Sequence, residues 1–76
     1  ITIQERMTEL LETLGARRRC AFEELFDRAI TTYEIVVTFL AIMELIKESL
    51  IEMVQSEPFG PIHVKPRGQD AVEVDH

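Results

Sequence analysis

Apolar residues recur at helical spacing from Thr31 to Leu50, in the stretch TTYEIVVTFLAIMELIKESL. No Pro or Gly interrupts this stretch, which is the longest of its kind in the chain. Thr31 and Glu34 form the T-x-x-E pattern of a capping box, in which each side chain accepts a backbone N–H left free by the first turn. We therefore predict a helix over residues 31–49 and expect the rest of the chain to be arranged around it.

The apolar face of this helix is wider than one core requires. A helix that packs on a single core shows an apolar stripe of about 100° or slightly more. On a wheel of about 100° per residue, two adjacent apolar groups exceed that width. We expect the first group to face the domain's own core and the second to face a partner protein, although short elements wrapping both sides of the helix remain an alternative. The first group is Ile35, Ile42, Leu45 and Ile46, and the second is Val36, Phe39, Leu40 and Met43.

The second group, together with Lys47 one turn further on, forms the candidate partner-binding stripe. Its positions follow the spacing i, i+3, i+4, i+7 and i+11, which a docking helix face uses to bury apolar area against a partner. We expect Leu40 to be the most exposed member and Phe39 to contact both core and partner. The candidate residues are Val36, Phe39, Leu40, Met43 and Lys47.

A shorter helix is predicted near the start of the chain. Thr2 and Glu5 form a second capping box. Apolar residues then keep helical spacing over residues 3–14, and Gly15 is the expected C-terminal cap. The apolar residues 1–3 are predicted to form a short edge strand.

Between these helices, residues 20–22 are expected to form a short extended segment and residues 23–29 a short helix. Phe22, Leu25 and Phe26 are expected to point inward from it. The run Arg17-Arg18-Arg19 is interpreted as a solvated loop, with contact to phosphates or an acidic partner as the alternative.

After the long helix the period of the pattern changes. Residues 50–55 are mostly apolar with β-branched members, residues 56–61 hold two Pro and one Gly, and residues 62–65 alternate apolar with polar. This indicates two strands joined by a loop. Residues 66–76 are polar without a helical period, and we predict a disordered tail.

Taken together, these elements predict an α+β winged-helix domain over residues 1–65, with three helices, a two-stranded wing and a short N-terminal strand. Several segments resemble the C-terminal winged-helix domain of the segregation and condensation protein A (ScpA) family, the bacterial kleisins. They are TIQERM, FEELF, VVTFLAIMELIK, and a strand ending in Gln before FGPI. The chain departs from the family pattern at Ala21, where Ser or Thr is usual, and at Pro61, where Asp or Glu is usual. The departures imply an uncapped second helix and a stiffer wing turn.

The resemblance implies a protein-interaction module that does no chemistry. Such kleisins bridge the two heads of a structural-maintenance-of-chromosomes (SMC) ATPase dimer during chromosome condensation and segregation. Their C-terminal winged helix holds one head on its outer side, away from the ATP site, and a ScpB-type partner binds elsewhere on the full-length protein. The resemblance also implies a cytoplasmic, nucleoid-associated protein.

The charge agrees with a protein partner. The net charge is -6 and the isoelectric point is about 4.8, which argues against binding of nucleic acid or of an anionic membrane surface. A DNA-binding winged helix of the transcription-regulator type is the alternative function, and self-association through the long helix is a third. The first residue is Ile, so we expect a piece of a longer protein.

Catalytic and metal-binding patterns are missing from the sequence. It contains no phosphate-binding glycine loop and no nucleophile elbow. His63 and His76 stand apart from Cys20, and a metal site needs several ligands at set spacing. We therefore predict no enzyme activity, no cofactor and no metal, with His63 on the surface and Cys20 as a small buried apolar residue.

Overall fold

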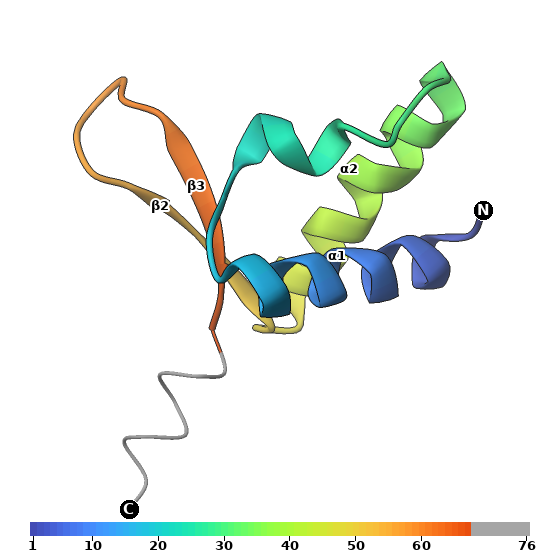
Figure 1. The fold of residues 1–76 in the computed structure, drawn as a ribbon, viewed down its shortest axis with the longest axis horizontal. Coiled ribbons are helices and arrows are strands. Elements are labelled where there is room, and N and C mark those ends of the chain that lie inside the picture. The colour runs from blue at the N-terminus through green and yellow to red at the C-terminus, as the bar shows by residue number, and fades with distance from the viewer. Residues whose placement is uncertain (68–76) are drawn as a thin grey trace, which may run out of the picture.

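Two α-helices and a small antiparallel sheet enclose one core (Figure 1). The computed structural model describes residues 1–67 of the 76-residue chain. The fold is α+β, as predicted. The helices are α1 (Ile3–Arg17), the short 3₁₀ helix η1 (Phe22–Phe26) and α2 (Thr32–Lys47), and the strands are β1 (Cys20–Ala21), β2 (Ile51–Gln55) and β3 (Ile62–Pro66).

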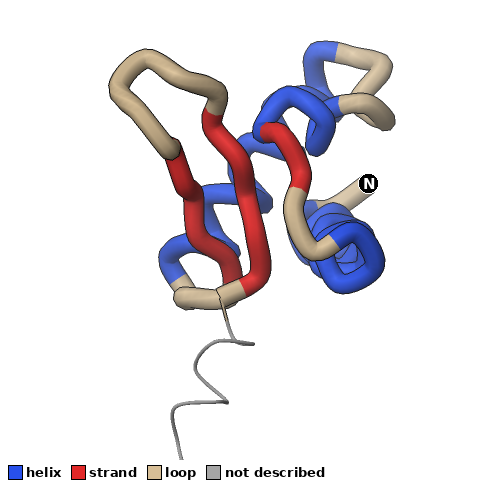
Figure 2. Tube along the Cα trace, turned by 60° about the vertical axis from the view of Figure 1, so that its left-hand side comes forward, coloured by secondary structure: helices blue, strands red, loops and turns tan. Residues whose placement is uncertain are grey.

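The sheet has the order β1-β3-β2, with both pairs antiparallel (Figure 2). Val64 in the middle strand lies opposite Cys20 on one side and Met53 on the other. Residues directly opposite in a sheet share a face. Cys20 and Val64 are almost fully buried, so this face covers the core.

Every described helix and strand contributes at least one side chain to the core. α1 and α2 supply most of its volume, and each strand adds one residue. A single contiguous cluster of this kind is typical of one domain. The cluster consists of Leu10, Leu14, Cys20, Leu25, Ala41, Ile42, Leu45, Ile51 and Val64.

The capping boxes predicted for the two α-helices are formed to different degrees. At α1 both bonds are present: the Thr2 N–H donates to Glu5 Oε1 at 2.9 Å and the Glu5 N–H donates to Thr2 Oγ1 at 3.1 Å. At α2 the Thr31 hydroxyl accepts the Glu34 N–H at 3.1 Å, but the Glu34 carboxylate accepts the N–H of Ile30 instead of Thr31. The carboxylate therefore fixes the loop before the helix as well as its first turn.

Replacing Thr31 by alanine is expected to destabilise the domain by about 1 kcal/mol, because the Glu34 N–H loses its acceptor. For a domain of this size the melting temperature should fall by roughly 4–8 °C. Thr32→Ala is the matched control, since this exposed neighbour is the first helical residue and makes no capping bond. Equal melting temperatures for the two variants would contradict a capping role for Thr31.

The N-terminal predictions need two corrections. Residues 1–3 do not form a strand, because the Thr2 N–H is engaged by Glu5 and α1 already begins at Ile3. Gly15 is not the C-cap of α1. The helix continues to Arg17, and Arg18 takes the left-handed position with φ 70° while its N–H donates to the Leu14 carbonyl.

The predicted second helix is a short 3₁₀ helix. The described residues therefore form two α-helices and one 3₁₀ helix, where three helices were predicted. η1 covers residues 22–26 of the expected region. Leu25 is buried as predicted, while Phe22 and Phe26 are half-buried with ring centroids 5.3 Å apart in an edge-to-face arrangement. As expected, Ala21 offers no capping side chain, although Glu24 Oε1 accepts its N–H at 2.9 Å.

The hairpin closely follows the prediction. β2 begins one residue later than expected, at Ile51, and β3 extends one residue further, to Pro66. The Arg67 N–H donates to the Leu50 carbonyl at 3.0 Å. The rest of the predicted tail, residues 68–76, lies outside the described residues.

Candidate protein-binding surface

One side of α2 is apolar and uncovered. The exposed fractions are 49% for Val36, 46% for Phe39, 44% for Leu40 and 36% for Met43. All four candidate apolar residues therefore lie outside the core. Exposure rises toward the start of α2, where Tyr33 reaches 62%, and this explains why Val36 is more exposed than Leu40, against our expectation.

The buried side of α2 is rotated from the one predicted. Ile42 and Leu45 are buried and Ile46 is half-buried, as expected, but Ile35 is 46% exposed, so its assignment to the core was wrong. The buried side also holds three residues outside the predicted core group. These are Val37, Thr38 and Ala41.

Two residues of the buried side are not of the large apolar type expected in a core. The Thr38 hydroxyl donates to the Glu34 carbonyl at 2.8 Å, so this polar group is satisfied within the helix and can be buried. Ala41 is small and fully buried, which is consistent with close approach of neighbouring elements. Ile35 points in nearly the same direction as the buried Ile42, which lies about two turns further on, so its exposure reflects its position near the start of α2, where exposure is higher.

The exposed side of α2, which we call the α2 face, is therefore broader than the predicted stripe. Phe39 was expected to contact both the core and a partner. It is exposed and lies outside the core cluster, so its contact with a partner is the part that remains a prediction. Lys47 is exposed and ends the helix, where a positive charge is favourable beside the last carbonyls. The apolar members of the α2 face are Tyr33, Ile35, Val36, Phe39, Leu40 and Met43.

Tyr33 and Ile35 are the residues that sequence reasoning missed. Tyr33 is anchored at the far end of the face, because its hydroxyl donates to the Ile1 carbonyl at 3.1 Å. No spacing separates Ile35 from the buried Ile42 two turns further on, but the spacing of Thr38, Ala41 and Leu45 does mark the buried side of the helix. Treating Thr as a polar residue concealed that spacing.

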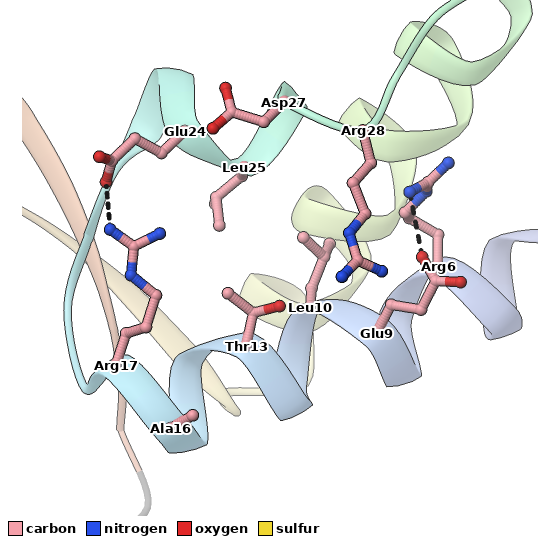
Figure 3. A pocket seen from close by; sticks show the side chains of 10 residues that line it. All are labelled: Arg6, Glu9, Leu10, Thr13, Ala16, Arg17, Glu24, Leu25, Asp27 and Arg28. Carbon is pink, nitrogen blue, oxygen red and sulfur yellow. Dashed lines mark hydrogen bonds and ion pairs between the residues drawn. The ribbon is translucent and has the colours of Figure 1, made fainter.

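A separate groove of about 360 Å³ lies between α1 and η1 (Figure 3). Its charged groups largely pair with one another: Arg17 lies 3.3 Å from Glu24, and Arg6 lies 3.0 Å from Glu9. The first of these pairs links α1 to η1 across the groove, and the second lies within α1. The lining has no His, Cys or Ser, and its one hydroxyl, that of Thr13, makes no hydrogen bond to a carboxylate.

The pKa of Glu24 is clearly displaced. The Ala21 N–H donates to its carboxylate and the Arg17 guanidinium lies beside it, and both lower the pKa of Glu24 below its ordinary value of 4.5. The ionised carboxylate thus stabilises the turn between α1 and η1. This contribution is present above the ordinary pKa and is lost as the pH falls through the lowered one.

We expect Glu24→Gln to lower the melting temperature at about pH 6, and the difference from the unaltered chain to shrink as the pH falls through the lowered pKa and the carboxylate becomes protonated. Thermal unfolding followed by circular dichroism over a series of pH values from about pH 6 downward measures this. Glu23→Gln is the control, because Glu23 is an exposed neighbour that makes no described hydrogen bond or ion pair. A Glu24→Gln difference that does not change with pH would contradict the argument.

The remaining candidate side chains do not come together. Cys20 is 1% exposed, as predicted. His63 is half-buried beside Ala21 and Val54, with Nδ1 enclosed and unpartnered, so its prediction as a surface residue was wrong. Over residues 1–67 no three side chains of metal-binding type gather, and His76 lies outside this range.

The basic run is divided between a helix and a loop. Arg17 belongs to α1 and pairs with Glu24, while Arg18 and Arg19 follow and are exposed.

None of the helices within residues 1–67 combines the length and apolar character that a membrane crossing needs.

Comparison with known proteins decides the family. Residues 1–66 match the family model of the segregation and condensation protein ScpA. The chain belongs to the ScpA family. The resemblance noted in the sequence is thereby confirmed.

The chain is also similar to individual ScpA proteins. It is 43% identical to segregation and condensation protein A of Myxococcus xanthus over 96% of this chain and 26% of that protein. It is 40% identical to the ScpA of Coxiella burnetii over 90% of this chain and 26% of that protein. The chain thus spans about a quarter of the length of these relatives.

A solved ScpA structure has the same fold. The match is to a crystal structure of the Smc head bound to the C-winged helix domain of ScpA, with a TM-score of 0.64 and 28% sequence identity. It covers 84% of this chain and 97% of the matched chain. Two α-helices, a 3₁₀ helix and a three-stranded antiparallel sheet are therefore this chain's form of the ScpA winged helix.

Proposed function

We propose that this chain binds the ATPase head of an SMC protein through the α2 face. The observation that carries the proposal is the row of six large apolar side chains left uncovered on one helix. Burial of such side chains in a partner is favourable at roughly 25 cal/mol per Å² of apolar surface. Contiguous exposed apolar patches mark interaction sites in soluble proteins.

The match to a ScpA winged helix bound to an Smc head supports the choice of partner. On this proposal, Val36, Phe39, Leu40 and Met43 form the apolar contact and Lys47 supplies a charge at its edge. The chain holds one end of a kleisin so that ATP-driven engagement of the heads opens or closes a ring around DNA in chromosome segregation. ATP is bound and hydrolysed by the SMC partner, and a ScpB-type partner binds other parts of the full-length protein.

We further propose that the domain itself has no catalytic activity and acts in the cytoplasm on the nucleoid. The groove between α1 and η1 supports the first point, because the hydroxyl of Thr13 in its lining is not hydrogen-bonded to any carboxylate that could activate it. The α2 face offers no catalytic chemistry either, since apart from the Tyr33 hydroxyl its exposed side chains are hydrocarbon and thioether groups.

The charges of α2 and the wing favour a protein over DNA. A DNA reader needs several basic side chains there to neutralise phosphates. The chain has Lys47 and Lys65, and Lys65 is paired with Glu52 at 3.3 Å. The acidic residues of the same elements outnumber them and are Glu34, Glu44, Glu48, Glu52 and Glu57.

Titration of this chain against the purified Smc head of the same organism tests the proposal, with and without nucleotide. We expect saturable binding to the head and none to duplex DNA at low salt. Binding to DNA without binding to the head would replace the proposal by the DNA-binding alternative. Sedimentation at several concentrations tests the third function, and a stable dimer would reassign the α2 face to self-association.

A further inference from the structure

The loop between β2 and β3 presents an aromatic side chain fully to solvent. Phe59 has a relative exposure of 103%, the highest of the large apolar residues within 1–67. Its φ is 65°, in the left-handed region that suits glycine and asparagine and is uncommon for a bulky side chain. Folding therefore gains no hydrophobic burial from Phe59 and bears a conformational cost at that position.

The rest of the loop holds Phe59 in this conformation. The Gln55 side chain donates to the Gly60 carbonyl at 2.8 Å, and the Gly60 N–H donates to the Glu57 carbonyl at 2.9 Å. A Cβ on Gly60 would lie 2.9 Å from Glu57 Cγ, so close approach requires the glycine there. Phe59 thus occupies the left-handed position in an otherwise well-bonded turn, and strained positions of this kind cluster at ligand-binding sites.

The hairpin carries an apolar face from the core to this loop. Met53 lies opposite the core residue Val64, and Ile62 lies opposite Gln55, two positions further along the same face. Met53 and Ile62 are each 38% exposed. The face that packs on the helices at its base therefore continues outward, partly uncovered, toward Phe59.

The α2 face alone is small for a stable interface. A standard interface buries about 800 Å² on each partner. A helix of 16 residues is about 24 Å long and about 10–12 Å across, so the footprint of one side is only a few hundred Å². In Figure 1 the wing loop and the start of α2 both lie on the side of the molecule away from the last described residues, at opposite ends of its long horizontal axis.

We propose that the wing is the second contact of the head-binding surface, with Phe59 inserted in an apolar pocket of the SMC head and with Met53 and Ile62 beside it. This inference rests on the proposed function and extends its surface beyond α2. The α2 face supplies the broad contact, and Phe59 supplies an aromatic anchor of the kind that dominates binding energy at protein interfaces.

Phe59→Asn tests the inference, because asparagine tolerates the left-handed conformation and removes the ring. We expect the melting temperature to rise by a few degrees and the affinity for the Smc head to fall about tenfold or more. Ser49→Asn is the matched control, since Ser49 has φ 63° at the other end of β2. It should raise the melting temperature without changing the affinity.

The outcomes separate this inference from the proposed function. If a folded Phe59→Asn variant bound with unchanged affinity, the wing contact would be overturned. The α2 face would still stand as the contact with the head if a second variant, Phe39→Arg on α2, lost binding. An equal loss of affinity in Ser49→Asn would also overturn it. Failure of the unaltered chain to bind the head would overturn both.

Discussion

Replacing Phe39 by arginine is expected to weaken binding to the Smc head at least 100-fold while the chain stays folded. The side chain is 46% exposed in the free domain, so an arginine there can reach water. In the complex the guanidinium would have to be desolvated without a partner, which costs several kcal/mol. Met43→Arg, one turn along the same face, should have a similar effect.

Titration calorimetry against the purified head measures the affinity, and circular dichroism confirms that each variant is folded. Thr8→Arg is the control, because it adds the same charge at an exposed position on α1. It should bind like the unaltered chain. If the Phe39 and Met43 variants stay folded and bind normally, the α2 face is not the head-binding surface.

The second large effect is expected in the core of the same helix. Leu45 is fully buried, and Leu45→Ala should destabilise the domain by about 2–5 kcal/mol because it leaves a cavity. Small domains are only marginally stable, so this is a large part of the total. The melting temperature should fall by about 10 °C or more.

Leu40→Ala is the same chemical change on the exposed side of α2, where Leu40 is 44% exposed. It should cost less than about 1 kcal/mol of stability, since little buried volume is removed. Its effect should appear instead as weaker binding to the Smc head. Comparable losses of stability in the two variants would contradict the division of α2 into a buried and an exposed side.

Most of the fold could be predicted, because local signals agree with the tertiary structure. The capping pattern at Thr2 and Glu5 placed the start of α1, and the change of period after residue 49 placed both long strands. The errors arose where one residue type serves two purposes. Thr2 suits a strand or a cap, and its N–H can serve only one of them; Gly15 suits a helix end, yet Arg18 takes the left-handed position.

The candidate surface could be predicted only in part. Spacing identified four of the six exposed apolar residues of α2, but the buried side of the helix includes Thr38, whose hydroxyl is satisfied inside the helix. That bond is invisible to a pattern that treats Thr as polar. The conformation of Phe59 was equally out of reach, because the adjacent Gly60 is the residue expected to adopt a positive φ.

The position of β3 has a consequence for how the domain forms. The last described strand of the chain is the middle strand of the sheet, so β1 and β2 cannot join until β3 has arrived. During synthesis, a nascent chain that has not yet released Ile62–Pro66 from the ribosome lacks both ladders and the core residue Val64. Both strand pairs of the sheet therefore form late, when β3 becomes available to pair with β1 on one edge and with β2 on the other.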